Sequence, residues 1–187
     1  MRYIFRRFLR KRFIVPLIGV IAASGGYVAH GHSAEISATS GNLVAARTLR
    51  VIDGDTAVFN IAGRKTTVRF IGVNTPETVK PNSPVECFGE QASAFTSSNL
   101  TDKSVYLELD PSQSKYDRYG RMLAYVWLGK TLYNLELIEE GYAYEATYAG
   151  PYRYQAEFKA AEKDARDHNR GLWNPRVCPQ RLSLIHI

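Results

Sequence analysis

The sequence predicts a mainly β domain with packed helices, an α+β fold in which five short strands form a small closed barrel. Two observations support this prediction. Between residues 43 and 128, short segments alternate between apolar and polar residues and are separated by turn residues, which is typical of barrel strands. Apolar residues at helical spacing appear mainly in the last third of the chain. With 187 residues, the chain has room for one domain of ordinary size.

Turn residues separate the predicted strands. Residues 53–55 (DGD) and 62–63 (AG) are turn signals between consecutive alternating segments. In the third segment Val68 and Phe70 face one side of the strand and Arg69 faces the other, because side chains alternate along a strand. Strands are predicted over residues 43–52, 56–61, 65–73, 105–110 and 121–128.

About three helices are predicted. Residues 89–100 are helical by composition. In the second helix Asn134 is expected to be the N-cap, and Gly141 is expected to follow the C-terminus as the C′ residue. The third helix has one apolar face and is closed by Gly171. That face consists of Tyr154, Phe158, Ala161 and Ala165.

The N-terminal region has the layout of an export segment. Residues 1–12 contain six Lys or Arg and no acidic residue, and residues 13–29 carry no charge. This order is typical of a signal peptide or an N-terminal membrane anchor, which we assign to residues 1–31. Residues 32–43 are expected to be a flexible linker. The domain after them is expected to be secreted, or anchored on the extracytoplasmic side of the membrane, because the basic flank stays in the cytoplasm. Cleavage and retention of the segment both remain open.

The C-terminal residues 182–187 (LSLIHI) resemble the translation of a sequencing adapter. We expect them to be adapter read-through and exclude them from the fold prediction.

The positive net charge does not identify a partner. The chain has 24 Lys or Arg and 18 Asp or Glu, for a net charge of +6. The six basic residues of the leader account for the whole excess, so the remaining chain is formally neutral. Bulk charge therefore gives the folded domain no preference for nucleic acid.

Several classes of chemistry are disfavoured by what the domain lacks. Of four histidines, only His168 lies inside the predicted domain. This argues against Ser-His-Asp and Cys-His catalysis and against histidine-based zinc sites. The sequence has neither a GxxxxGK[ST] phosphate loop nor a GxGxxG motif. Chemistry must then rest on carboxylates, arginines and tyrosines, with or without an oxygen-bound metal.

Three polar motifs follow the predicted strands. They are DGDT at residues 53–56, Arg69 followed by NTPE at residues 74–77, and DRYGR at residues 117–121. Each motif alone also fits an ordinary charged turn. Together they combine hard oxygen ligands, two arginines and a free carboxylate, as phosphodiester hydrolysis requires. A metal and arginines offset charge on the phosphoryl oxygens, and a carboxylate positions water.

Six segments in order extend this pattern over most of the chain. They are VIDGDT (51–56), VRFIGVNTPE (68–77), CFGEQASAFT (87–96), DRYGRMLAYVW (117–127), NLELIEEGYA (134–143) and RGLW (170–173). In these segments the chain resembles the staphylococcal nuclease family over about residues 45–175. The resemblance implies an OB-fold barrel, which we place at residues 44–178. It also implies calcium-dependent cleavage of DNA and RNA that leaves 3′-phosphate ends.

The resemblance also implies roles for individual residues. The implied Ca²⁺ site consists of Asp55, Asn74 and Thr75, with Asp53 nearby. The implied catalytic residues are Arg69 and Arg121 as phosphate clamps and Glu77 as general base or water-orienting group. The implied substrate contacts are Tyr119 and Tyr148. Asn74 departs from the family pattern, which has an aspartate ligand there, and the departure predicts a weaker calcium site.

Cys87 and Cys178 are the only cysteines, and they are predicted to form a disulfide. An exported domain reaches an oxidising compartment, and two cysteines make one even pair. Two free or separately buried thiols are the alternative.

Two classes of function compete. The first is an exported calcium-dependent endonuclease, expected to be a monomer, with DNA and RNA as substrates and membrane contact only through an uncleaved N-terminal segment. The second is a catalytically weak OB-fold module that binds single strands on aromatic and basic residues. Asp55 and Glu77 favour the enzyme, because a binding module has no evident need for carboxylates that repel phosphate. A carboxylate-pair glycosidase is a distant third, since the arginines would have no role in it.

Overall fold

The computed structural model describes residues 43–78 and 85–179. All of them belong to one compact unit, Glu35–Ile187. The predictions for the leader, for the linker up to residue 42 and for residues 182–187 lie outside the described residues. Within the described part, no helix is both long and apolar enough to span a membrane.

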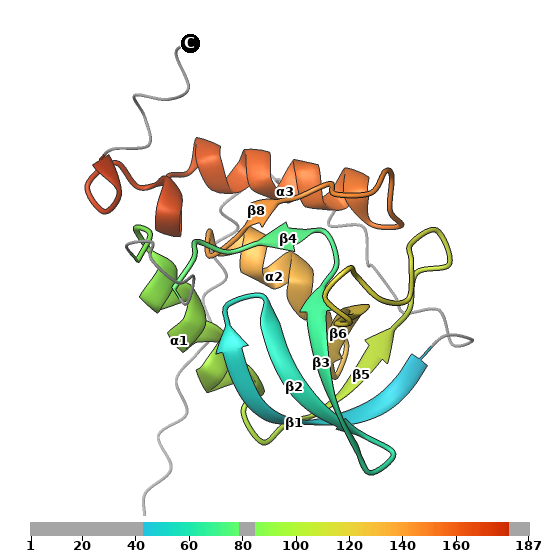
Figure 1. Cartoon of the computed structure of the whole chain (residues 1–187). Helices are drawn as coiled ribbons and strands as arrows, with labels where there is room; N and C mark the ends of the chain where they lie inside the picture. Colours follow the sequence, from blue (N-terminus) through green and yellow to red (C-terminus); the bar gives the residue numbers. More distant parts are fainter. Residues whose placement is uncertain (1–42, 79–84, 180–187) are drawn as a thin grey trace, which may run out of the picture. The chain divides into compact units, whose positions relative to one another are not determined.

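Five strands close into a barrel (Figure 1). They are β1 (Leu43–Asp53), β2 (Thr56–Ile61), β3 (Arg64–Phe70), β5 (Ser104–Glu108) and β6 (Met122–Leu128). Neighbours pair in the order β3-β2-β1-β5-β6, and parallel pairing of β3 with β6 closes the ring. This confirms the predicted five-stranded barrel. Closure leaves none of these strands as a free edge.

Three further strands of two residues each lie outside the ring of five. β4 (Val73–Asn74) pairs with β8 (Tyr144–Glu145), and β7 (Thr131–Leu132) pairs with the end of β6 in antiparallel orientation. The third strand was expected to run to Val73, but β3 ends at Phe70 because Gly72 has a φ of 75°. A β-carbon on Gly72 would also lie 2.7–2.8 Å from ring atoms of Tyr152 and Phe158. The chain therefore bends here and carries Asn74 away from the barrel.

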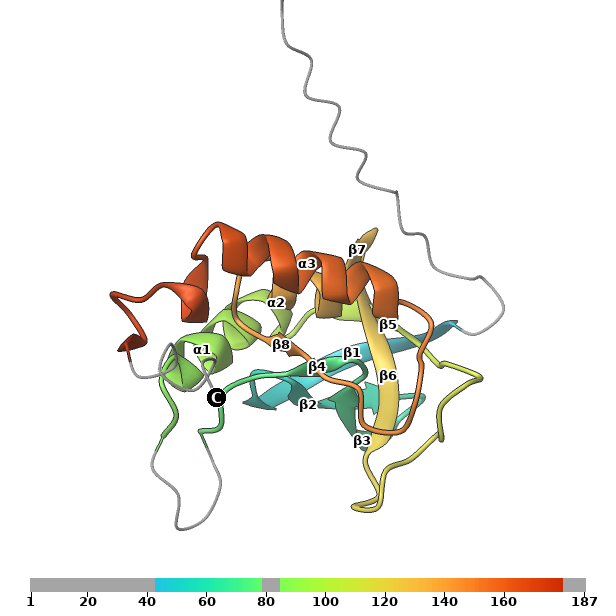
Figure 2. The ribbon, with the colours of Figure 1, turned by 90° about the horizontal axis from the view of Figure 1, so that it is seen from above.

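Three helices pack beside the barrel, as predicted: α1 (Gly89–Leu100), α2 (Tyr133–Glu139) and α3 (Gln155–Asp167). α1 packs against β1, while α2 lies between β6 and α3 (Figure 2). A 3-10 turn, Gly171–Trp173, follows α3. Gly141 has a φ of 73° directly after the C-cap Glu140, as expected of the C′ residue.

The N-cap prediction for Asn134 is wrong. α2 begins two residues earlier than predicted, at Tyr133, with Leu132 at the N-cap position and no side-chain cap. Asn134 is buried instead, where its carbonyl accepts the Val126 N–H at 2.8 Å and its amide donates to the Ile71 carbonyl at 2.9 Å. Hydrogen bonds to β6 and to the residue that follows β3 thus take the place of a local cap.

Cys87 and Cys178 form a disulfide, with their Cα atoms 5.9 Å apart. This confirms the predicted pair and excludes the alternative of free thiols. The bond ties the segment before α1 to the chain after the 3-10 turn.

Candidate functional site

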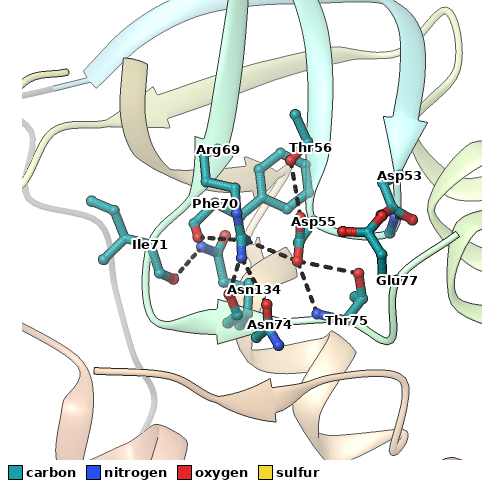
Figure 3. A network of polar contacts seen from close by, with 12 residues as sticks. Asp53, Asp55, Thr56, Arg69, Phe70, Ile71, Asn74, Thr75, Glu77 and Asn134 are labelled. Carbon is teal, nitrogen blue, oxygen red and sulfur yellow. Dashed lines mark hydrogen bonds and ion pairs between the residues drawn. The ribbon is translucent and has the colours of Figure 1, made fainter. Parts of the chain in front are cut away.

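The candidate site lies where the β1–β2 turn approaches β4 and the residue that follows it, Thr75 (Figure 3). Asp55 ends the β1–β2 turn, and Thr75 directly follows β4. The two segments are so close that a β-carbon on Gly54 would lie 2.6 Å from the methyl carbon of Thr75. Any residue larger than glycine would collide with the Thr75 side chain and push the turn away from it.

The Asp55 carboxylate is buried and accepts hydrogen bonds on both oxygens. Oδ1 accepts the Thr56 hydroxyl at 2.9 Å. Oδ2 accepts the Thr75 N–H at 2.8 Å and the Thr75 hydroxyl at 3.2 Å. A guanidinium nitrogen of Arg69 lies 2.9 Å from the same oxygen. Asp55 therefore joins the β1–β2 turn to Arg69 on β3 and to Thr75 after β4.

Arg69 also holds the β4 segment. The guanidinium nitrogen that faces Asp55 donates to the Val73 carbonyl at 2.9 Å. The other terminal nitrogen donates to the Asn74 amide oxygen at 3.1 Å and to the Tyr148 hydroxyl at 3.3 Å. Because the Arg69 side chain is only 11% exposed, these contacts hold the planar group in one orientation.

Asn74 and Tyr148 contact each other although 74 residues separate them. The Tyr148 hydroxyl donates to the Asn74 amide oxygen at 2.9 Å. The Tyr148 residue is 71% exposed, with the Arg69 Cζ 5.8 Å from its ring centre. An exposed ring whose hydroxyl is anchored beside an arginine gives a nucleobase a surface for stacking.

Two further acids, Asp53 and Glu77, lie on the other side of Asp55 (Figure 3). Asp53 is buried, and its Oδ1 accepts the Gly54 N–H and the Thr78 hydroxyl, each at 2.8 Å. Burial, helped by the negative charges of Asp55 and Glu77, raises the pKa of Asp53 to about 6. The two hydrogen bonds act against that rise. Asp53, Asp55 and Glu77 together thus place an excess of negative charge here, which a cation would offset.

Arg121 is oriented by its own turn. The Asp117 carboxylate accepts the Arg121 side-chain Nε–H at 2.6 Å and the Arg121 backbone N–H at 2.9 Å. The ring of Tyr119, which is 68% exposed, has its centre 5.3 Å from the Arg121 Cζ. Burial alone would raise the pKa of Asp117, but these bonds to Arg121 lower it below its ordinary value. Asp117 therefore keeps its charge and holds the guanidinium.

Both arginines lie on the outer face of the barrel. Arg69 is paired with Leu123 across parallel strands β3 and β6, and Arg121 lies two residues before Leu123. Residues two apart in an extended segment face the same side. Desolvation raises the pKa of Tyr148, and the charges of Arg69 and Arg121 both act against that rise. The Tyr148 hydroxyl is thus within electrostatic reach of both guanidinium groups.

The oxygen groups at the site suit a hard cation. Among the described residues, no three His, Cys, Asp or Glu side chains are grouped as a metal site by themselves. The implied set differs in kind, because it combines the Asp55 carboxylate with the Asn74 amide and the Thr75 carbonyl. Calcium accepts such mixed oxygen ligands. The observation that fits a cation here is the grouping of three carboxylates, those of Asp53, Asp55 and Glu77, beside the one guanidinium of Arg69.

The structure thus places Asp53, Asp55, Arg69, Asn74, Thr75, Glu77 and Tyr148 around one site, with Arg121 and Tyr119 on the neighbouring turn. The sequence interpretation missed the supporting roles of Asp117, Thr78 and Asn134. Thr78 directly follows the NTPE motif, so its position could have drawn attention to it. For Asn134 the sequence holds no signal, because both of its partners are backbone groups, which every part of the chain carries.

Comparisons with known proteins found a matching family and several relatives. The family model described as "Staphylococcal nuclease homologue" matches residues 67–175. The chain is 46% identical over 128 residues to "Thermonuclease" of Staphylococcus hyicus, a match covering 68% of this chain and 75% of the relative. It is 45% identical to "Thermonuclease" of Staphylococcus intermedius over 124 residues, 66% of this chain and 73% of the relative. "Endonuclease YncB" of Bacillus subtilis is 37% identical over 126 residues, 67% of this chain and 59% of the relative.

Proposed function

Since the chain belongs to the staphylococcal nuclease family, we propose that it is an exported, calcium-dependent endonuclease. It is a hydrolytic nuclease of that family, with nucleic acids as substrates. We further propose that it cleaves both DNA and RNA with little sugar specificity and leaves 3′-phosphate ends. In this proposal the enzyme acts as a monomer outside the cytoplasm.

The observation that carries this proposal is the pairing of Arg69 with Asp55 at one end of an outward face that Arg121 also occupies. A scissile phosphate bound there would meet two guanidinium groups held in fixed orientations by Asp55 and Asp117. Fixed positive groups stabilise the charge that develops on the phosphoryl oxygens, and they need no reorganisation to do so.

The remaining groups of the site have complementary roles in the proposed reaction. Glu77 would orient or deprotonate the attacking water, since it is the one of the three acids that is only partly buried, whereas Asp53 and Asp55 are buried. Tyr148 and Tyr119 would hold the nucleotides that flank the phosphate. Calcium, held by Asp55, Asn74 and Thr75, would polarise a phosphoryl oxygen.

A direct assay distinguishes the nuclease from the competing interpretation, a catalytically weak binding module. The purified protein is incubated with single- and double-stranded DNA and RNA, with calcium or with a chelator, and the product ends are identified. If the nuclease proposal is right, both DNA and RNA are cleaved when calcium is present and neither is cleaved in chelator. The products then carry phosphate on their 3′ ends. Binding without cleavage at millimolar calcium would decide for the binding module.

A further inference from the structure

We propose that the outer face of β1, β2 and β3 binds the part of a single-stranded substrate that extends beyond the active site. This inference rests on the proposed nuclease function and adds a second contact region to it. We name the region the barrel-face surface. It consists of Arg47, Arg50, Asn60, Lys65 and Tyr106.

The barrel-face surface is continuous with the active site along β3. Val68 and Phe70 belong to the core, so Lys65 and Arg69 of the same strand point outward. Asn60 on β2 is paired with Lys65 and shares its side. Four residues of strand separate Arg69 from Lys65, or roughly 13 Å at ~3.3 Å per residue. A strand leaving the Arg69 site along β3 would therefore reach Lys65 within a few nucleotides.

A bulge in β1 adds two arginines to the same face. Arg47 is paired with Asn60, and Arg50 is paired with Val58, which leaves Leu49 as the extra residue. In a regular strand residues three apart face opposite sides. The bulge cancels that alternation, so the exposed side chains of Arg47 and Arg50 both lie beside β2 on the outer face.

The charge of this face is positive although the domain as a whole is formally neutral. Between residues 43 and 69 the only acids are Asp53 and Asp55, both at the active-site end. One acid lies close to the far end, where Asp102 is 3.7 Å from Arg47. Both side chains of that pair are well exposed, so it contributes little stability and a phosphate can replace the carboxylate.

An exposed aromatic ring lies at the far end of the surface. Tyr106 on β5 is 49% exposed and is paired with Ala45 of β1. It borders an open hollow on the outer face, whose other lining residues include Arg47, Asn60, Gly63 and Ser104. A ring beside a basic strip is the combination that binds single strands, since bases stack on the ring and phosphates meet the cations.

The helices leave the β2–β3 part of this face open. α1 packs against β1, where Thr96 donates to the Gly54 carbonyl in the β1–β2 turn. The helices pack mainly against β1, β6 and β8 rather than against β2 or β3, and no helix lies over the β2–β3 hairpin in Figure 1. A flexible strand thus has access from Arg69 to Tyr106 without any rearrangement of the fold.

The test compares long and short substrates in a charge-removal variant. Arg47→Gln/Arg50→Gln/Lys65→Gln removes three cations from the surface, and Lys130→Gln/Lys159→Gln/Arg176→Gln removes three exposed cations elsewhere as the matched control. Binding of a single strand of about 16 nucleotides, the upper end of OB-fold site sizes, is measured in chelator over a range of salt. Cleavage of the same strand and of a trinucleotide is measured in calcium.

We expect the surface variant to bind the long strand on the order of tenfold more weakly, with the control variant unchanged. The slope of the logarithm of the binding constant against the logarithm of the salt concentration should become shallower by about 2. Each lost contact to a single-strand phosphate lowers that slope by about 0.7. KM for the long strand should rise while its kcat and the trinucleotide kinetics stay the same. Asp102→Asn should act in the opposite direction and tighten binding of the long strand, because it removes the acid beside Arg47.

An unchanged salt slope, or an equal loss for trinucleotide and long strand, would overturn the proposal. So would binding of anionic lipid vesicles that is lost in the same variant while strand binding persists, because the face would then belong to a membrane surface. The chelator measurement does not require cleavage. Failure of the nuclease proposal, seen as no cleavage by the wild type, is therefore distinguishable from failure of this one.

Discussion

The guanidinium of Arg69 lies 2.9 Å from the carboxylate of Asp55, and both side chains are almost fully buried. The same guanidinium reaches Val73 and Asn74, so one side chain fixes the β1–β2 turn against β4. An implied metal ligand and an implied phosphate clamp thus hold each other in place.

Arg69→Ala is expected to lower kcat on the order of 10²-fold or more, as loss of a preorganised charge does. Arg121→Ala should do likewise. Arg69→Lys should not restore activity, because an ammonium cannot reproduce the planar fork shared by Asp55 and Asn74. Steady-state cleavage of a single-stranded oligonucleotide measures this, with thermal unfolding as the check on folding. Near-normal kcat in Arg69→Lys would show that only its charge matters.

Glu77→Gln is expected to lower kcat by a similar factor while substrate affinity stays close to that of the wild type. The substitution keeps the shape of the side chain but removes the group proposed to orient or deprotonate water. The neighbouring carboxylate of Glu86, whose Oε2 accepts the Glu77 N–H, supplies the matched control Glu86→Gln. Equal activity of Glu77→Gln and the wild type would remove Glu77 from the mechanism.

Asn74→Asp is expected to bind calcium at least severalfold more tightly, because it adds a negative charge to the implied ligand set. The Asn74 amide oxygen already accepts from Arg69 and Tyr148, so the side chain faces the site. Calorimetric titration of calcium, with and without a nucleotide, measures the affinity. Asn60→Asp on the outer barrel face is the control. Identical affinities in wild type and Asn74→Asp would mean that residue 74 is not a ligand.

Replacing Cys87 and Cys178 by serine is expected to lower the free energy of unfolding by up to about 4–5 kcal/mol. The disulfide spans 91 residues, and a long loop loses much entropy in the unfolded chain when it is closed. Urea unfolding at neutral pH measures the loss. A reducing agent should destabilise the wild type and leave the double variant unchanged. An unchanged unfolding free energy in the variant would contradict the entropic account.

Acid is expected to destabilise the domain partly through Asp110. Burial raises the pKa of Asp110, but hydrogen bonds from the Arg153 N–H, the Tyr125 hydroxyl and Ser112 lower it more, so it lies below the ordinary 3.8. Because the folded-state pKa is the lower one, this stabilisation is complete above the unfolded-state pKa. It is lost as the pH falls through the folded-state value.

Urea unfolding between neutral and strongly acidic pH tests this expectation. The wild type should lose stability below about pH 4, and Asp110→Asn should show a shallower loss over the same interval. Asp102→Asn, on an exposed turn, should follow the wild type. Parallel curves for the wild type and Asp110→Asn would show that Asp110 does not contribute.

Much of the fold could be predicted from local patterns. Alternation marked the barrel strands, helical spacing marked α3, and the turn motifs placed Asp55 and Arg121 at strand ends. Gly141 could be recognised as a helix terminator, and Cys87 with Cys178 could be recognised as a pair. Each of these signals depends on a few neighbouring residues, or on a count, and so survives without knowledge of the fold.

The tertiary structure alone decided how these pieces meet. The parallel pairing of β3 with β6 brings Arg69 and Arg121 to one face, and no local pattern specifies a pairing between strands about 50 residues apart. The extra residue Leu49 turns Arg47 and Arg50 to the same side, against simple alternation. Asn134 does not have its expected capping role, because it is buried and bonds the backbone N–H of Val126 and the backbone carbonyl of Ile71. Strand register and buried hydrogen bonds belong to the closed barrel as a whole, whereas periodicity belongs to each segment by itself.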